Sequence, residues 1–165
     1  MNDADKKKLY QGVAILVNME APLNNMIGRS ARAAKHWTEL VKANKTLDEK
    51  QRAAMKRVVT GVTKLTTDAK TVLKDLNALG TDAGNAKLLA AAPTAKEFRD
   101  KVVSKRLASS KKFDQDAHQV LLDLKGVLGG SLFIGMNDVD VKVTVNSLND
   151  FSSSYNKMRI ELAKL

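Results

Sequence analysis

The side chains that most often carry catalysis or bind metal are sparse in this chain. It has two histidines, His36 and His118, and no cysteine. Asp114 and His118 are four residues apart, so they share one face of a helix and could supply half of a metal site. Di-metal enzymes built in helical bundles use a Glu-x-x-His pair together with further inward glutamates. No glutamate stands three residues before either histidine. We therefore predict a surface Asp–His pair and no metal site.

Other motifs with known chemistry are also missing. The stretch GTDAGNAK, residues 80–87, contains glycine and lysine but lacks the spacing and the Lys-Ser/Thr ending of a phosphate-binding loop. The patterns G-x-S-x-G and H-E-x-x-H and the calcium loop do not occur. Without cysteine there is neither a disulfide framework nor a thiolate nucleophile. We predict a non-enzymatic protein with no catalytic residue, no cofactor and no small-molecule substrate.

The charge balance of the chain indicates what kind of partner it attracts. The formal net charge is +10, from 28 basic and 18 acidic residues. A basic protein is drawn to acidic proteins, anionic lipid or nucleic acid, although a lysine-rich solvated surface is the simpler explanation. The densest basic stretch predicts a face that steers acidic partners, formed by Arg99, Lys101, Lys105, Arg106, Lys111 and Lys112. A second basic stripe, nearer the N-terminus, consists of Arg29, Arg32 and His36.

The clearest helical pattern lies in the middle of the chain. Apolar residues alternate in steps of three and four at Met55, Val58, Val62, Leu65, Ala69, Val72, Leu76 and Leu79, the spacing of a helix packed against others. Thr46 and Glu49 predict a capping box at its start, and Gly80 predicts its end. A first helix over 4–43 shows similar spacing. Pro22 predicts a kink there, or a division into helices 4–20 and 22–43.

Two further helices follow Pro93. A third begins with a capping box of Thr94 and Glu97, and its apolar residues are Phe98, Val102, Ser109, Phe113, Ala117, Val120, Leu124 and Val127. A shorter fourth helix covers 148–165. These elements predict an all-α fold of one domain over 1–165, an elongated up-down-up-down four-helix bundle. Because the fourth helix would reach only halfway along its neighbours, we expect a groove that remains uncovered.

The connection between the third and fourth helices differs from the rest of the chain. Residues 125–145 mix four glycines with apolar side chains, and 138–145 strictly alternate polar and apolar residues. This alternation favours a small β-hairpin of 131–136 and 138–145, and the alternative is a helix that starts at Asn137. The predicted apolar contact patch is Leu128, Leu132, Phe133, Ile134 and Met136. Such a patch either plugs the end of the bundle, binds a partner or enters a membrane.

Three functions are compatible with these patterns. The favoured one is protein–protein interaction or self-association through the apolar connection 127–136 and the uncovered groove. The second is a membrane-active bundle that docks on anionic lipid. Its organisation is similar in outline to that of α-helical pore-forming toxins, which store an apolar hairpin on a helical bundle, but only the architecture is shared. The third is non-specific nucleic-acid binding, although no helix-turn-helix or interleaved aromatic residues support it.

The expected location follows from two missing features. The first residues, MNDADKKKLYQG, contain no apolar run that leads to a cleavage site. No stretch approaches the ~20 apolar residues of a membrane-spanning helix. We expect a cytoplasmic protein, or one exported by a route without a cleaved Sec signal.

Overall fold

The protein is all-α in the part of the chain that its structure, a computed structural model, describes. These described residues are 1–127 and 137–165, and all their regular secondary structure is helical. The elements are α1 (Asp3–Val13), α2 (Leu16–Met26), α3 (Arg29–Ala43), α4 (Glu49–Ala83), α5 (Ala86–Ala90), α6 (Ala95–Phe98), a π-helical turn η1 (Arg99–Val103), α7 (Ser104–Arg106), α8 (Ala108–Val127) and α9 (Val139–Ala163).

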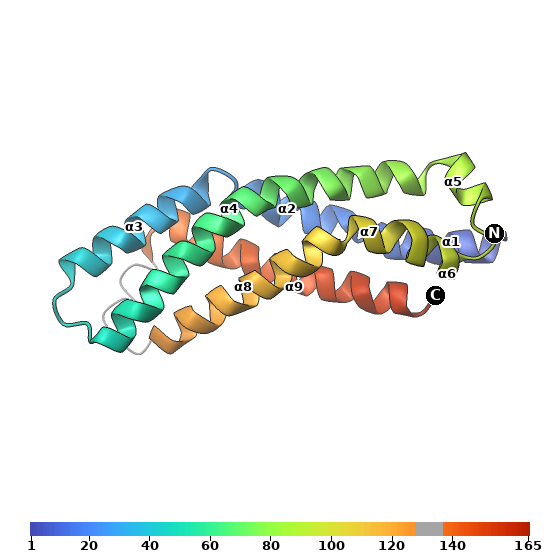
Figure 1. The fold of residues 1–165 in the computed structure, drawn as a ribbon. Coiled ribbons are helices and arrows are strands. Elements are labelled where there is room, and N and C mark those ends of the chain that lie inside the picture. Colours follow the sequence, from blue (N-terminus) through green and yellow to red (C-terminus); the bar gives the residue numbers. More distant parts are fainter. Residues whose placement is uncertain (128–136) are drawn as a thin grey trace.

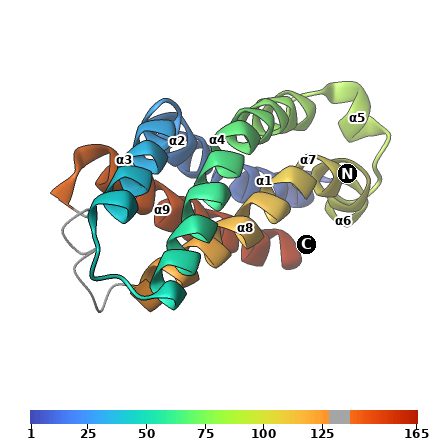
Figure 2. The same ribbon diagram turned by 60° about the vertical axis from the view of Figure 1, so that its left-hand side comes forward.

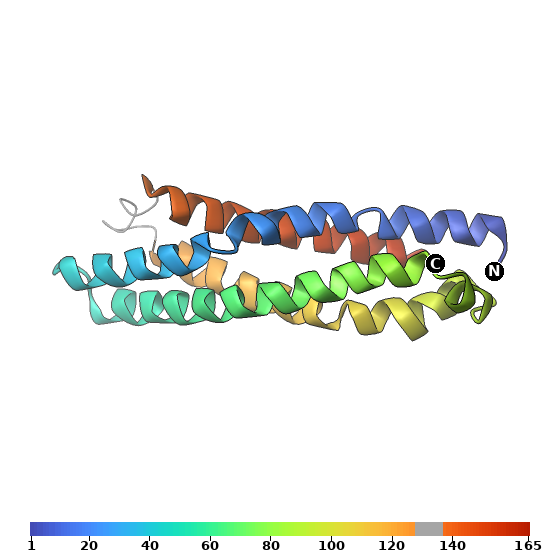
Figure 3. The ribbon, with the colours of Figure 1, turned by 90° about the horizontal axis from the view of Figure 1, so that it is seen from above.

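The long helices lie side by side along one axis, so the molecule is elongated (Figure 1). Helices α1, α2 and α3 follow one another away from the N-terminal end, and α4 returns along α3 (Figures 1 and 3). The short elements α5 and α6 turn the chain at that end, from which α8 runs back along α4. Helix α9 then returns beside α2 and α3 and brings the C-terminus close to the N-terminus (Figure 2).

The first helical region is broken in two places, and neither break is at Pro22. Pro22 lies inside α2. The first break is at residues 14–15, where the amide of Ile15 bonds to the carbonyl of Gly12 in a tighter turn. The second is at Gly28, whose φ of 83° is in the left-handed region that only glycine enters without strain. The predicted kink, and the division into 4–20 and 22–43, were therefore wrong in position.

Helix α4 confirms the predicted apolar seam but not its predicted ends. All eight seam residues are buried. The capping box is formed by Asp48 and Gln51, because the Asp48 carboxylate accepts from the amide of Gln51 at 2.7 Å and the Gln51 side chain accepts from the amide of Asp48. Gly80 lies inside the helix, which continues to Ala83. The predicted cap of Thr46 and Glu49 and the predicted end at Gly80 were both wrong.

The third helical region begins with the Thr94 half of the predicted capping box, while the Glu97 side chain accepts from Lys101 instead, and the region then changes its repeat. The Thr94 hydroxyl accepts from the amide of Glu97 at 3.2 Å and caps α6. In η1 the amide of Ser104 bonds to the carbonyl of Arg99, five residues earlier, so the turn holds one extra residue. The buried seam consequently continues from Phe98 to Val103 rather than to Val102. Beyond η1 it includes Ser110 in place of the predicted Ser109.

The last helix is longer than predicted. Asp138 caps α9 by accepting from the amide of Val141 at 3.1 Å, so residues 139–145 are helical and their prediction as a strand of a hairpin was wrong. Val141, Thr144 and Leu148 are fully buried, at the steps of three and four that a helix requires. With 25 residues, α9 packs along α3, α2 and α1. It therefore covers the groove that a short fourth helix would have left there.

Candidate functional site

The contact between α8 and α9 is closed at its base by aromatic rings. Phe113 of α8 packs edge-on against Phe151 of α9, with ring centroids 4.7 Å apart. Tyr155 stacks on Phe151 one turn later, with centroids 6.3 Å apart. Phe113 and Phe151 are almost completely buried, whereas Tyr155 is 9% exposed. These rings fill the space between the two helices, and Tyr155 forms the floor of a surface groove between them.

This groove, here called the α8–α9 groove, consists of two adjoining hollows. One has a volume of about 500 Å³ and lies between α8 and the middle of α9. The other, of about 540 Å³, lies between η1, α7 and the start of α8 on one side and the end of α9 on the other. Lys111, Tyr155 and Arg159 line both hollows. Val103, Leu107 and Leu162 give the second hollow an apolar floor.

The π-helical turn shapes the second hollow. Its extra residue rotates Val103 into the core and leaves Arg99 and Ser104 at the groove. The Arg99 guanidinium donates to the carbonyl of Leu162 at 3.0 Å, which ties η1 to the end of α9. It also pairs with Asp100 at 2.8 Å. Isolated π-helical turns are frequent at functional sites, and this one lies along the α8–α9 groove.

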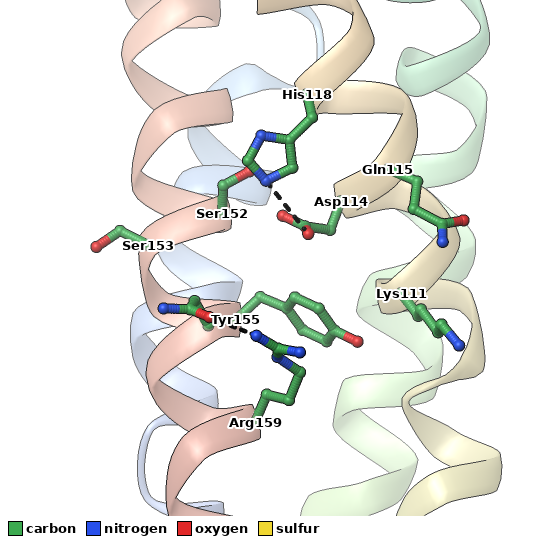
Figure 4. A pocket seen from close by; sticks show the side chains of 9 residues that line it. Lys111, Asp114, Gln115, His118, Ser152, Ser153, Tyr155 and Arg159 are labelled. Carbon is green, nitrogen blue, oxygen red and sulfur yellow. Dashed lines mark hydrogen bonds and ion pairs between the residues drawn. The ribbon is translucent and has the colours of Figure 1, made fainter.

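Two cations of the groove meet no acid within the described residues. The side chain of Lys111, on α8, has no hydrogen bond or ion pair there, and that of Arg159, on α9, donates only to the side chain of Asn156 at 3.0 Å. Both side chains belong to exposed residues. Figure 4 shows the ring of Tyr155 reaching from α9 toward α8 between them. The groove thus presents an apolar floor with an unpaired cation on each wall.

The other end of the groove is polar. Nε2 of His118 lies 3.5 Å from Oδ2 of Asp114, so these two residues form the predicted Asp–His pair (Figure 4). Beneath it, Oδ1 of Asp114 and the hydroxyl of Ser152 are buried and have no hydrogen-bond partner in the structure. Among the residues that the structure describes, no group of three or more histidines and carboxylates could hold a metal ion. This end therefore offers polar side chains to an occupant of the groove.

Burial and charge both act on the phenol of Tyr155. Desolvation raises the pKa of Tyr155 above its usual value, and the negative charge of Asp114 raises it further. Arg159 opposes this by lowering the same pKa. Tyr155 therefore remains a neutral phenol at physiological pH and contributes an uncharged ring to the groove.

The six residues of the predicted basic face differ in what they contact. Arg99 and Lys111 line the α8–α9 groove. Lys101 pairs with Glu97 at 3.2 Å, and Arg106 pairs with Asp82 of α4 at 2.7 Å. Lys105 and Lys112 are exposed, and Lys112 lies beside Lys64 of α4.

The second predicted basic stripe is occupied by acids of the same chain. Arg32 of α3 donates to both carboxylate oxygens of Asp140, at 3.0 and 3.2 Å, and Arg29 lies 3.8 Å from the same group. This hydrogen bond and the charge of the guanidinium hold the pKa of Asp140 below its usual value. Nδ1 of His36 lies 3.9 Å from Asp138. These basic residues therefore pair with acids at the start of α9, although the side chains of Arg29 and Arg32 stay partly exposed.

Sequence reasoning missed the α9 side of the groove. It did not single out Ser152 or Arg159, although residues 152, 155 and 159 follow helical spacing on one face. The predicted apolar contact patch, Leu128, Leu132, Phe133, Ile134 and Met136, lies outside the described residues.

Comparison with known proteins places no constraint on this assignment. No protein-family model matches the chain, and no curated protein or solved structure matches it either. Among the helices of the described ranges, none is both long and apolar enough to cross a membrane.

Proposed function

We propose that this chain is a non-enzymatic interaction protein, an up-down-up-down four-helix bundle of one domain, and that its α8–α9 groove binds an acidic segment of a partner protein. The observation that carries the proposal is the pair of unpaired cations, Lys111 and Arg159, on the two walls above an apolar floor. An acidic segment with apolar side chains would neutralise both cations and cover the floor.

The charge of the whole molecule supports an acidic partner rather than a second copy. Two copies that each carry a formal charge of +10 repel one another, and the repulsion is greatest where their basic surfaces meet. An acidic partner is instead attracted at a distance and gains its specificity at the groove. Arg99 adds a third positive charge at one end of the groove, where Asp100 partly compensates it.

Photo-crosslinking from the groove tests this function. A photoreactive amino acid is placed at Leu107, which lines the groove, or at Leu122, which lies on α8 outside it and is 63% exposed. In a lysate of the source cells, we expect position 107 to capture a protein whose cross-linked peptide is rich in Asp and Glu. Position 122 should not capture it, and Lys111→Glu with Arg159→Glu should abolish the capture.

Three results would contradict this function: no protein adduct at position 107, equal adducts at both positions, or a cross-linked peptide that is basic. Flotation with neutral and anionic vesicles separates the membrane-active alternative. The groove proposal expects no vesicle binding that survives high salt, because its cations act through screened electrostatic attraction. Vesicle binding that persists at high salt would indicate apolar insertion and would favour the membrane-active bundle.

A further inference from the structure

We infer that the occupant of the α8–α9 groove is an amphipathic α-helix with acidic flanks, which lies along the groove as an additional helix. This inference rests on the proposed function and specifies the partner segment by its shape and by the position of its charges. Three properties of the groove support a helix over an extended peptide: its walls, its length and the arrangement of its cations.

The walls of the groove offer little to the backbone of an extended peptide. Both are helical, one formed by η1, α7 and α8 and the other by α9, so their backbone amides and carbonyls bond mainly within the helices, and no strand edge occurs in 1–127 or 137–165. An extended segment laid on the floor of Leu107, Tyr155 and Leu162 would bury backbone polar groups without partners, which is costly. A helix satisfies its own backbone and can place only side chains on this floor.

The length of the groove matches a short helix. On the first wall, formed by η1, α7 and α8, it extends from Arg99 to His118, which at 1.5 Å per residue is roughly 28 Å. On the α9 wall it extends from Ser152 to Ala163, roughly 16 Å. A helix of about 12 to 14 residues, roughly 18 to 21 Å long, spans the α9 wall and presents an apolar residue to the floor at each turn.

The cations define where the acidic residues of that helix must lie. Lys111 projects from one wall and Arg159 from the other, and both line the two hollows where they adjoin. A bound helix therefore needs an apolar stripe facing Tyr155 and carboxylates on both sides of the stripe near its middle. A helix with acids on only one flank would leave one of the two cations unpaired.

Synthetic peptides of about 14 residues test each requirement. The first has an apolar stripe at helical spacing with glutamates on both flanks, and the second has the same composition without a stripe. The third carries glutamine in place of glutamate, and the fourth is the first with a central proline, which breaks the helix. We expect only the first to bind, to become helical by circular dichroism, and to shift the NMR signals of Ser152, Tyr155 and Arg159.

Matched charge variants locate the binding. Lys111→Glu with Arg159→Glu should weaken binding of the first peptide roughly tenfold or more, because each exchange replaces an attraction by a repulsion. Lys70→Glu with Lys74→Glu makes the same change in formal charge at exposed positions of α4 and should alter the affinity less than about twofold. Equal losses in the two variants would mean general attraction to a basic protein and would overturn the inference.

The outcomes separate this inference from the proposed function. If position 107 captures an acidic segment that stays extended when bound, or if the proline peptide binds as well as the first, the helical form is wrong and the proposed function remains. If the first peptide does not bind, the captured segment itself is synthesised, and its failure to become helical on binding would overturn the inference. If no acidic peptide binds and position 107 captures nothing, both are wrong.

Discussion

Helix α8 packs against two neighbours and makes a different kind of contact with each. Toward α4 the contact is close: a Cβ atom added to Gly61 would lie 2.5 Å from a methyl group of Val120. Charged side chains cross this interface along its length, with Arg57 bound to Asp123 at 3.2 Å and Lys64 to Asp116 at 2.8 Å. Toward α9 the described residues form no ion pair, and the aromatic rings leave a groove above them.

The two contacts of α8 differ in whether acidic side chains of the same chain pair with the basic ones. Asp116 and Asp123 of α8 face α4, and Asp75 and Asp82 of α4 bind Ser109 and Arg106 in return. At the start of α9, Asp138 lies near His36 of α3, and Asp140 pairs with Arg29 and Arg32 of the same helix. Lys111 and Arg159 are left on the open side. On the α4 side, called here the closed side although a surface hollow of about 400 Å³ lies beside Gly61 and Val120, the charged side chains are therefore paired within the chain. On the α9 side, Lys111 and Arg159 pair with no acid among the described residues.

The largest effect is expected where α8 and α9 touch. Phe113→Ala removes a ring that is 1% exposed and packs on Phe151, so the free energy of unfolding should fall by about 3 to 5 kcal/mol. Urea unfolding measures this fall. Leu122→Ala, at an exposed position of the same helix, should change it by no more than about 0.5 kcal/mol. A loss below about 1.5 kcal/mol for Phe113→Ala would mean that the rings do not hold the base of the groove.

The second-largest effect tests the close packing of α8 against α4. Gly61→Ala should lower the free energy of unfolding by about 1 to 3 kcal/mol, because the stiff Val120 side chain cannot move away freely. Gly80→Ala is the matched control in the same helix. An added Cβ there meets nothing within 4 Å, so higher helix propensity should raise stability by up to about 1 kcal/mol. Val120→Ala should relieve the cost of Gly61→Ala. If Gly61→Ala stabilises the protein as Gly80→Ala does, the close packing is wrong.

The two interfaces also differ in how far the sequence predicts them. All eight predicted residues of the α4 seam are buried, because apolar residues in steps of three and four admit only one helical face, and only the buried Ala54 and Ala83 were missed. The close approach of α4 and α8 was not predicted, because the sequence does not show that Val120 lies opposite Gly61. The all-α class and the cap at Thr94 follow from local patterns that do not depend on distant residues.

The groove escaped prediction for two physical reasons. The extra residue of η1 changes the face on which Arg99 and Val103 lie, and a regular helical repeat cannot anticipate a shift of one residue. The placement of Lys111 and Arg159 on opposite walls of the groove depends on how two helices far apart in sequence approach each other. The start of α9 was mistaken because valines at every second position fit a strand, while Val141, Thr144 and Leu148 fit a helix equally well.

Adjacent serines of α8 provide a smaller test of the closed side. Ser109 donates to Asp75 at 2.6 Å, whereas the hydroxyl of Ser110 is buried without a partner. Ser109→Ala should lower the free energy of unfolding by about 1 kcal/mol, and Ser110→Ala should raise it by about 1 kcal/mol. Chemical denaturation of the two variants measures this difference of sign. Two losses of similar size would show that Ser110 is hydrogen-bonded, for instance through a water molecule.

The smallest expected effect concerns the open side and uses Tyr155 as a reporter. The difference in phenolate absorbance between the protein and Tyr155→Phe isolates this residue, and its midpoint should lie above the ordinary value of about 10. Asp114→Asn removes a negative charge that raises this pKa, so the midpoint should move down.

The sign of the linked stability effect follows from the direction of the shift. A phenol whose pKa is raised by folding contributes stability below its unfolded pKa, and this contribution is lost as the pH rises through the folded pKa. Tyr155→Phe should therefore reduce the loss of unfolding free energy at alkaline pH. Near neutral pH the phenol is uncharged, so the substitution should have no electrostatic effect on stability there. If an acidic helix fills the groove, it adds burial and negative charge beside the phenol, and the midpoint should rise further. An unchanged midpoint with the peptide bound would place that peptide elsewhere on the molecule.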